Sequence, residues 1–167
     1  MPRTHSRKTT CGLFGHTLAE YRDLYGDDLR RMQNYQIALY TIIDEQIAAG
    51  MRHFASLLRP GAALWMSEYV LMQRLALGHL GLQLHILYTQ PALTEADGLA
   101  HAVLRGANTT ALIRARNEAG QLHKLMERSG RMVIVGRCAG TEDLCACAKS
   151  EGIAVFRYAM ADLIRGE

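Results

Sequence analysis

Short runs of aliphatic residues alternate along this sequence with longer segments in which apolar residues recur every three or four positions. The short runs are typical of strands and predict six of them, at residues 9–16, 51–58, 82–90, 100–107, 131–137 and 152–159. The longer segments predict amphipathic helices between the strands. This alternation predicts an α/β fold, a Rossmann-like three-layer sandwich with an open, mostly parallel sheet and helices on both faces.

The pattern is stronger in some segments than in others. The run at 131–137 is continuously apolar, as expected for a strand buried on both faces of a parallel sheet. Residues 17–27 are polar and lead into a strongly periodic helix that ends at Gly50. The run at 100–107 is the weakest strand. Asn108-Thr109-Thr110 after it predicts the N-cap of a long helix that reaches Met126.

Length and composition predict one globular domain over residues 9–167, preceded by a disordered basic lead-in at 1–8. No apolar run approaches the roughly 18–20 residues that a membrane span requires, so we expect a cytoplasmic protein without a membrane partner. Three basic residues of the lead-in account for the whole net charge of +3. The remaining basic and acidic side chains balance, which makes direct nucleic-acid binding unlikely.

The four cysteines do not form a recognisable metal motif. Cys145 and Cys147 fall in a predicted helix, where residues two apart point in nearly opposite directions, and histidine partners at zinc-finger spacing are absent. Free thiols are the expectation in a cytoplasmic chain. We therefore predict neither a metal nor a cofactor.

A parallel sheet binds ligands at the carboxyl ends of its strands, near the N-termini of the following helices. Gly15, His16 and Thr17 follow the first predicted strand, where glycine allows a ligand to approach the backbone and His16 offers a polar contact. A turn glycine beside a surface histidine explains the same residues equally well. Gly140 and Thr141 follow the strand at 131–137; they predict either an anion site at a helix N-terminus or an ordinary N-cap.

The corner after the second predicted strand contains Ser56, Arg59 and Gly61, and Glu68 lies further along the following helix. Arg59 offers a charged contact for a phosphate group. Glu68 is either a contact for ligand hydroxyls or a solvated side chain. No nucleophile–base pair, Walker loop or dinucleotide-binding glycine motif is recognisable in the sequence.

Taken together, these corners resemble the YpsA-like branch of the SLOG superfamily, Rossmann-like proteins related to phosphoribohydrolases and to DNA-processing proteins. Most of the chain, about 11–163, follows that pattern, so the domain at 9–167 is SLOG-like. The family's Phe-Thr-Gly-His-Arg is Leu13-Phe14-Gly15-His16-Thr17 here. The second motif, Ser-Gly-Gly-Ala-x-Gly, reads Ser56-Leu57-Leu58-Arg59-Pro60-Gly61, and the family's Gly-Gly-Thr is Ala139-Gly140-Thr141.

The resemblance implies a nucleotide or nucleotide-derived ligand, and Leu57, Leu58 and Ala63 depart from it where the family has two glycines and an aspartate. We expect a domain that binds or senses such a ligand without catalysis, through Gly15, His16, Thr17, Ser56, Arg59, Gly61, Glu68, Gly140 and Thr141. One alternative is a scaffold for a protein partner or for self-association, including a homodimer. A third is a hydrolase of nucleotide N-glycosidic bonds with Glu68 as its carboxylate.

Overall fold

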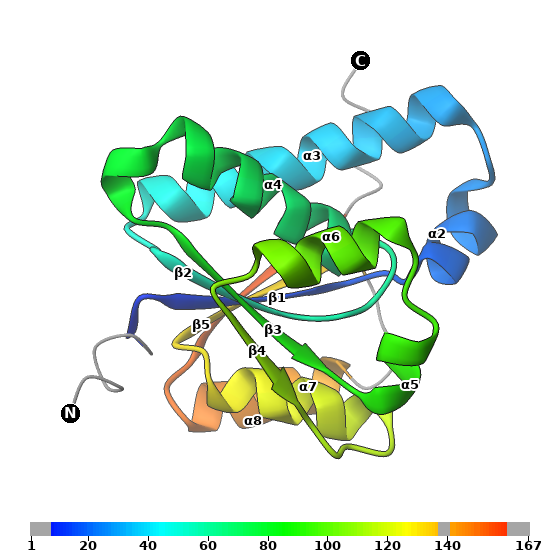
Figure 1. Ribbon diagram of the computed structural model, residues 1–167. Coiled ribbons are helices and arrows are strands. Elements are labelled where there is room, and N and C mark those ends of the chain that lie inside the picture. Colours follow the sequence, from blue (N-terminus) through cyan, green and yellow to red (C-terminus); the bar gives the residue numbers. More distant parts are fainter. Residues whose placement is uncertain (1–7, 137–140, 160–167) are drawn as a thin grey trace.

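Six parallel strands form one open sheet in the order β4-β3-β2-β1-β5-β6 (Figure 1). The computed structural model describes residues 8–136 and 141–159. Each of the strands β1 to β5 is followed by at least one helix that returns the chain to the same end of the sheet, which is why every pair is parallel. The strands are β1 (Thr10–Gly15), β2 (His53–Leu57), β3 (Gln83–Tyr88), β4 (Thr109–Leu112), β5 (Arg131–Val135) and β6 (Ala154–Tyr158).

Helices cover both faces of this sheet, so the predicted three-layer α/β sandwich is confirmed (Figure 1). Helices α3, α4 and α6 pack on one face, and α7 and α8 on the other. The helical elements are α2 (Leu18–Tyr25), α3 (Leu29–Ala48), α4 (Ala62–Ala76), the 3-10 turn η1 (Gly78–Leu80), α5 (Gln90–Thr94), α6 (Gly98–Gly106), α7 (Glu118–Glu127) and α8 (Thr141–Ser150).

Two apolar cores follow from the alternation of side chains along the strands. In β2, Phe54 enters the core under α3 and α4, while Ala55 and Leu57 enter the core under α7 and α8. Strands β1 and β5, at the centre of the sheet, are almost entirely buried. The apolar run predicted as a strand thus corresponds to β5, which is buried on both faces as the sequence predicts.

Most helices begin at a side chain that caps the free backbone amides of the first turn. The Asp28 side chain accepts from the Arg31 amide at the start of α3. Asn117 caps α7 in the same way, through the Gly120 amide. These caps fix where each helix leaves the carboxyl edge of the sheet, which is the edge that carries the predicted ligand site.

The prediction of a strand at 100–107 is wrong, because residues 98–106 form α6. Asp97 caps this helix, and Ala100 and Val103 are buried three positions apart, which is helical rather than strand spacing. The predicted cap at Asn108-Thr109-Thr110 is also wrong. Thr109 begins the edge strand β4, and the helix starts only after Asn117.

The polar segment 17–27 contains a helix that the sequence pattern did not predict, α2. Thr17 and Glu20 form a reciprocal capping box at its start. Residues 1–7, Cys138 and Gly140 lie outside the described residues, so the disordered lead-in predicted for 1–8 is described only at Lys8. Among the helices that the structure describes, none combines the length and apolar character needed to cross a membrane.

Candidate functional site

The order in which successive strands are added to the sheet reverses between β1 and β5. Strands β1 to β4 follow one another to one side, and β5 and β6 add to the other side of β1. Open α/β sheets commonly bind ligands at the carboxyl ends of the strands beside such a reversal. The corners after β1, β2 and β3 and the first turn of α7 all lie at this edge. This edge is therefore the candidate location of a ligand site.

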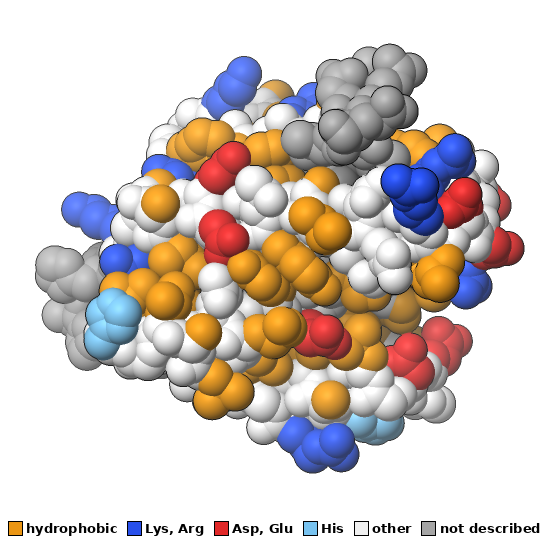
Figure 2. Space-filling model, turned by 90° about the horizontal axis from the view of Figure 1, so that it is seen from above, with side chains coloured by type: hydrophobic (Ala, Val, Ile, Leu, Met, Phe, Trp, Pro, Cys, Tyr) orange, Lys and Arg blue, Asp and Glu red, His pale blue; other side chains and the backbone are white. Residues whose placement is uncertain are grey.

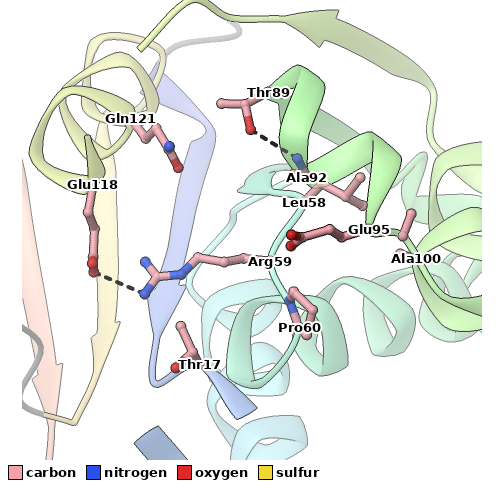
Figure 3. Close-up of a pocket in the computed structure, with 11 residues that line it drawn as sticks. Thr17, Leu58, Arg59, Pro60, Thr89, Ala92, Glu95, Ala100, Glu118 and Gln121 are labelled. Atoms are coloured by element: carbon pink, nitrogen blue, oxygen red, sulfur yellow. Dashed lines mark hydrogen bonds and ion pairs between the residues drawn. The ribbon is translucent and has the colours of Figure 1, made fainter. Parts of the chain in front are cut away.

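A pocket of about 400 Å³ opens at this edge, on the β2 and β3 side of the reversal (Figure 3). Its walls come from the corner after β1, the corner after β2, the segment around α5 and the first turn of α7. A volume of this size suits a small organic ligand. The lining residues are Thr17, Leu58, Arg59, Pro60, Thr89, Ala92, Glu95, Ala96, Ala100, Glu118 and Gln121.

The corners after β1 and β2 are tied to each other by backbone hydrogen bonds. The Leu18 amide donates to the Pro60 carbonyl at 3.0 Å, and the Ala62 amide donates to the His16 carbonyl at 2.9 Å. Gly61, between these contacts, has φ of +121°, and a Cβ there would overlap the His16 carbonyl oxygen. The amide of Ala62, the first residue of α4, is thus used within the protein rather than presented to an anion.

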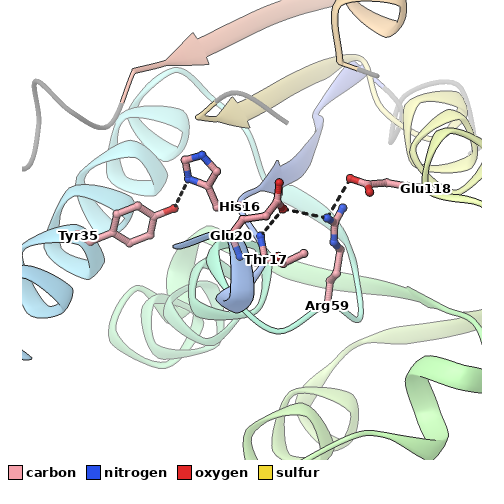
Figure 4. A network of polar contacts seen from close by, with 6 residues as sticks. All are labelled: His16, Thr17, Glu20, Tyr35, Arg59 and Glu118. Carbon is pink, nitrogen blue, oxygen red and sulfur yellow. Dashed lines mark hydrogen bonds and ion pairs between the residues drawn. The ribbon is translucent and has the colours of Figure 1, made fainter. Parts of the chain in front are cut away.

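His16 is turned into the protein and does not line the pocket (Figure 4). Only 3% of its surface is exposed, and its Nδ1 lies 3.3 Å from the Tyr35 hydroxyl. The imidazole also covers Gly136, where any Cβ would collide with the ring. Burial lowers the pKa of His16, and the nearby Glu20 carboxylate opposes this shift more weakly.

Aromatic side chains surround His16 on the side of α2, α3 and α4. The rings of Tyr25 and Tyr35 lie 6.3 and 6.4 Å from the imidazole, and Tyr21 packs on Trp65 with perpendicular rings. The Tyr21 hydroxyl is buried with no hydrogen-bond partner among the described residues. This cluster stabilises the docking of α2 on α3, which is a structural role for the corner after β1.

Arg59 extends from the corner after β2 across the end of β1 towards α7 (Figure 3). Its guanidinium lies 4.6 Å from the centre of the Phe14 ring, and its Nη2 is 2.9 Å from Glu118 Oε1 and 3.5 Å from Glu20 Oε1. The contact with Glu118 is an ion pair, and Glu118 Oε1 has no hydrogen-bond partner among the described residues. Only 13% of the arginine side chain is exposed.

One nitrogen of this buried guanidinium, Nη1, has no hydrogen-bond partner among the residues that the structure describes. Buried donors are almost always paired, so an unpaired guanidinium nitrogen beside a pocket requires an explanation. Glu20 is already committed, since its Oε1 accepts from the Thr17 amide at 2.9 Å (Figure 4). The pocket therefore contains an incompletely satisfied cation.

The remaining predicted site residues are distributed over several places. Thr17 lines the pocket, but its hydroxyl is used in the helix cap. Gly15 ends β1 beneath Ala62 and Val135. Ser56 is fully buried in β2 and donates to the Leu57 carbonyl. Thr141 begins α8, and Gly140 lies outside the described residues.

Glu68 does not line the pocket. It lies in the second turn of α4, close enough to Tyr40 of α3 to raise the pKa of that phenol, an effect smaller than that of burial. Of the predicted ligand-binding residues that the structure describes, only Thr17 and Arg59 line the pocket, and Gly61 supports the corner behind them.

The sequence did not point to Glu95, Glu118 or Gln121, which also line the pocket. Asn117 followed by Glu118 carries an N-cap signal, but its relevance depends on knowing that α7 starts opposite Arg59. Leu57 and Leu58 stand where the SLOG motif that the sequence resembles has two glycines. They are buried in opposite cores, because β2 continues to Leu57 and the Leu58 amide still donates to the Leu87 carbonyl of β3.

No cluster of three or more metal-binding side chains occurs within residues 8–136 and 141–159. Cys11 and Cys145 are buried free thiols, and burial raises the pKa of Cys11 to about 12. A comparison of the whole sequence with protein-family models finds no match, and a search of curated proteins finds none either. The function is therefore inferred from the geometry of the pocket.

Proposed function

We propose that this protein binds a nucleotide or nucleotide-derived small molecule in the pocket at the carboxyl edge of the sheet, without catalysing a reaction on it. The observation that carries this proposal is the buried Nη1 of Arg59, which lacks a partner beside a cavity of about 400 Å³. Nη1 itself exposes less than 1 Å² of surface, so a ligand oxygen, from phosphate or carboxylate, would complete the guanidinium only after a neighbouring side chain moves. The nucleotide class comes from the resemblance to the SLOG superfamily.

The lining favours binding over chemistry. Among its described residues there is no histidine or cysteine, and the hydroxyls of Thr17 and Thr89 accept hydrogen bonds from helix amides. A glycosidic-bond hydrolase needs a carboxylate near the sugar, and Glu68 lies outside the lining. Glu95 and Glu118 are the carboxylates that such an enzyme would have to use. Release of free base from nucleoside monophosphates would favour that alternative over a binding function.

The direct test is isothermal titration calorimetry with a panel of nucleosides, nucleoside mono-, di- and triphosphates, and dinucleotides. We expect at least one member to bind, and Arg59→Met to weaken that binding at least about tenfold by removing a charged contact. Arg22→Met is the matched control, because Arg22 pairs with Asp27 on the exposed surface of α2. If no member of the panel binds, the nucleotide proposal is wrong.

Self-association is a second candidate function, favoured by apolar side chains on the face covered by α3 and α4 (Figure 2). Leu75 is 84% exposed, Ile37 58% and Met72 51%. Large exposed aliphatic groups of this kind are depleted on surfaces that face only water, and gathered ones mark contact surfaces. Sedimentation velocity across a hundredfold range of concentration tests it: a constant monomer mass would remove this candidate.

A further inference from the structure

Arg59 carries two carboxylate contacts of different kinds. Glu20 is held by the α2 cap, since its Oε1 accepts from the Thr17 amide and its own amide donates to Thr17 Oγ1. Glu118 has no such commitment: its Oε1 lies 2.9 Å from Arg59 Nη2 and has no hydrogen-bond partner among the described residues. Among the described contacts, Arg59 is therefore the one partner that holds the Glu118 carboxylate in place.

Both Glu118 and Arg59 line the pocket, and Figure 3 shows them reaching towards each other from opposite walls. An anionic group entering the pocket to bind the guanidinium meets a carboxylate already in contact with that guanidinium. The two negative groups repel each other at short range unless one of them moves. Glu118, which is 40% exposed at the start of α7, can move into water at little cost.

From these contacts we infer that Glu118 is an internal competitor for the ligand: its carboxylate occupies Arg59 in the free protein and must be displaced before an anionic ligand group binds there. Glu118 thereby sets which anions the pocket accepts. This inference concerns the same pocket as the proposed function and rests on it to that extent. It does not depend on the ligand being a nucleotide.

The charge of the lining supports this role. The described lining contains a single cation, Arg59, and two carboxylates, Glu95 and Glu118, with Glu20 behind the arginine. Groups that carry several negative charges, such as diphosphates, are therefore opposed in the free protein. A singly charged group that displaces Glu118 keeps the net charge around Arg59 constant. An anion that leaves Glu118 in place, or that brings more than one negative charge, adds to the repulsion.

The test measures binding of inorganic pyrophosphate by calorimetry to the wild-type chain and to Glu118→Gln. We expect the glutamine variant to bind pyrophosphate at least about tenfold more tightly, because it removes the competing charge. Glu118→Ala serves as a second variant of the same site, and thermal unfolding checks that both are folded. In Arg59→Met/Glu118→Gln, the gain must disappear, since the contact for the anion is gone.

Glu95→Gln is the matched control, because it removes one negative charge from the same lining while no ion pair between Glu95 and Arg59 is found among the described residues. A gain of less than about threefold in this variant supports the inference. Equal gains in Glu95→Gln and Glu118→Gln would reduce the effect to the general field of the pocket and overturn it. So would unchanged pyrophosphate binding in both variants at Glu118.

These outcomes are separate from those of the nucleotide panel. If Glu118→Gln gains pyrophosphate affinity and no nucleotide binds to any form of the chain, the competitor role stands and the nucleotide proposal falls. If nucleotides bind the wild-type chain and the Glu118 variants equally, the nucleotide proposal stands and the competitor role falls.

Discussion

The corners after β1 and β2 lie side by side and share backbone hydrogen bonds. Each carries one polar side chain that was predicted to contact a ligand, but His16 is buried in the protein and Arg59 lines a pocket. His16 is directed inward, where it contacts the Tyr35 hydroxyl and covers Gly136. Arg59 crosses a pocket, with Nη2 close to two carboxylates and Nη1 without a hydrogen-bond partner among the described residues. The sequence predicted both residues as ligand contacts, because each follows a predicted strand.

The difference between the two corners shows what separates a structural polar residue from a candidate binding residue. His16 occupies the space above β1 and β5, where ligands of open α/β sheets are usually held, and thereby fills it with protein. The pocket lies towards β2 and β3 instead, where Arg59 borders an open volume. Unsatisfied hydrogen-bonding capacity next to a cavity is the distinguishing observation.

The largest expected effect tests whether the two corners form one rigid unit. Gly61→Ala should destabilise the protein by about 3 kcal/mol, since alanine is strained at φ of +121° and its Cβ would meet backbone atoms of the corner after β1. Urea unfolding measures the loss. Gly98→Ala, at an open helical position, is the control and should change stability by less than about 1 kcal/mol. Equal effects would mean that the corners move independently.

An intermediate effect sharpens the contrast between His16 and Arg59. His16→Ala should cost about 2 kcal/mol of unfolding free energy, because it leaves a cavity among aromatic rings and removes the contact with the Tyr35 hydroxyl. Arg59→Met should cost less than about 1 kcal/mol, because its ion-pair partners are partly exposed and become solvated. Chemical denaturation of both variants measures the order. A larger loss in Arg59→Met would reverse the assignment of structural and binding roles.

The smallest effect concerns pH. Burial lowers the pKa of His16, His53 and His85 in the folded protein, so the unfolded chain takes up protons first as the pH falls. Stability is therefore fully present above the unfolded value of about 6.5 and decreases as the pH falls from there towards the lowered folded pKa values. His16→Gln should flatten part of this decrease, whereas Arg59→Met should leave it unchanged.

Urea unfolding at pH 7.5 and 5.0 measures this dependence for the three proteins. The part that remains in His16→Gln is assigned to His53 and His85, whose Nδ1 and Nε2 are 3.0 Å apart, with Thr109 Oγ1 2.7 Å from His85 Nδ1. Two protons cannot be added to this pair without placing two cations in contact. An increase of stability on acidification would contradict the assignment for all three histidines.

The sequence was sufficient to predict the layered α/β architecture, because strands buried on both faces and strongly periodic helices leave clear patterns. It was insufficient at the edge of the sheet. Strand β4 is short and mostly exposed, so it lacks an apolar run, while the neighbouring helix α6 is short and apolar enough to resemble a strand. The missed helix α2 depends on the Thr17–Glu20 capping box rather than on apolar periodicity.

The candidate site was predicted only in part, because it is assembled from residues that are distant in sequence. Arg59 could be proposed from its position after a buried strand. Glu118 lies far along the chain in a helix whose start was misplaced, so its approach to Arg59 could not be inferred. The burial of His16 depends on Gly136, whose missing side chain leaves room for the imidazole ring.

The central position of β1 has a consequence for how this protein is made. Cys11 pairs with Phe54 on one side and with Arg131 on the other, so one edge of β1 stays unpaired until β5 has been synthesised. When only β1 to β4 of a nascent chain have left the ribosome, the edge of β1 that will later pair with β5 is exposed to solution. Chaperone dependence and aggregation during translation should therefore be decided by the arrival of β5 rather than by the stability of the finished fold.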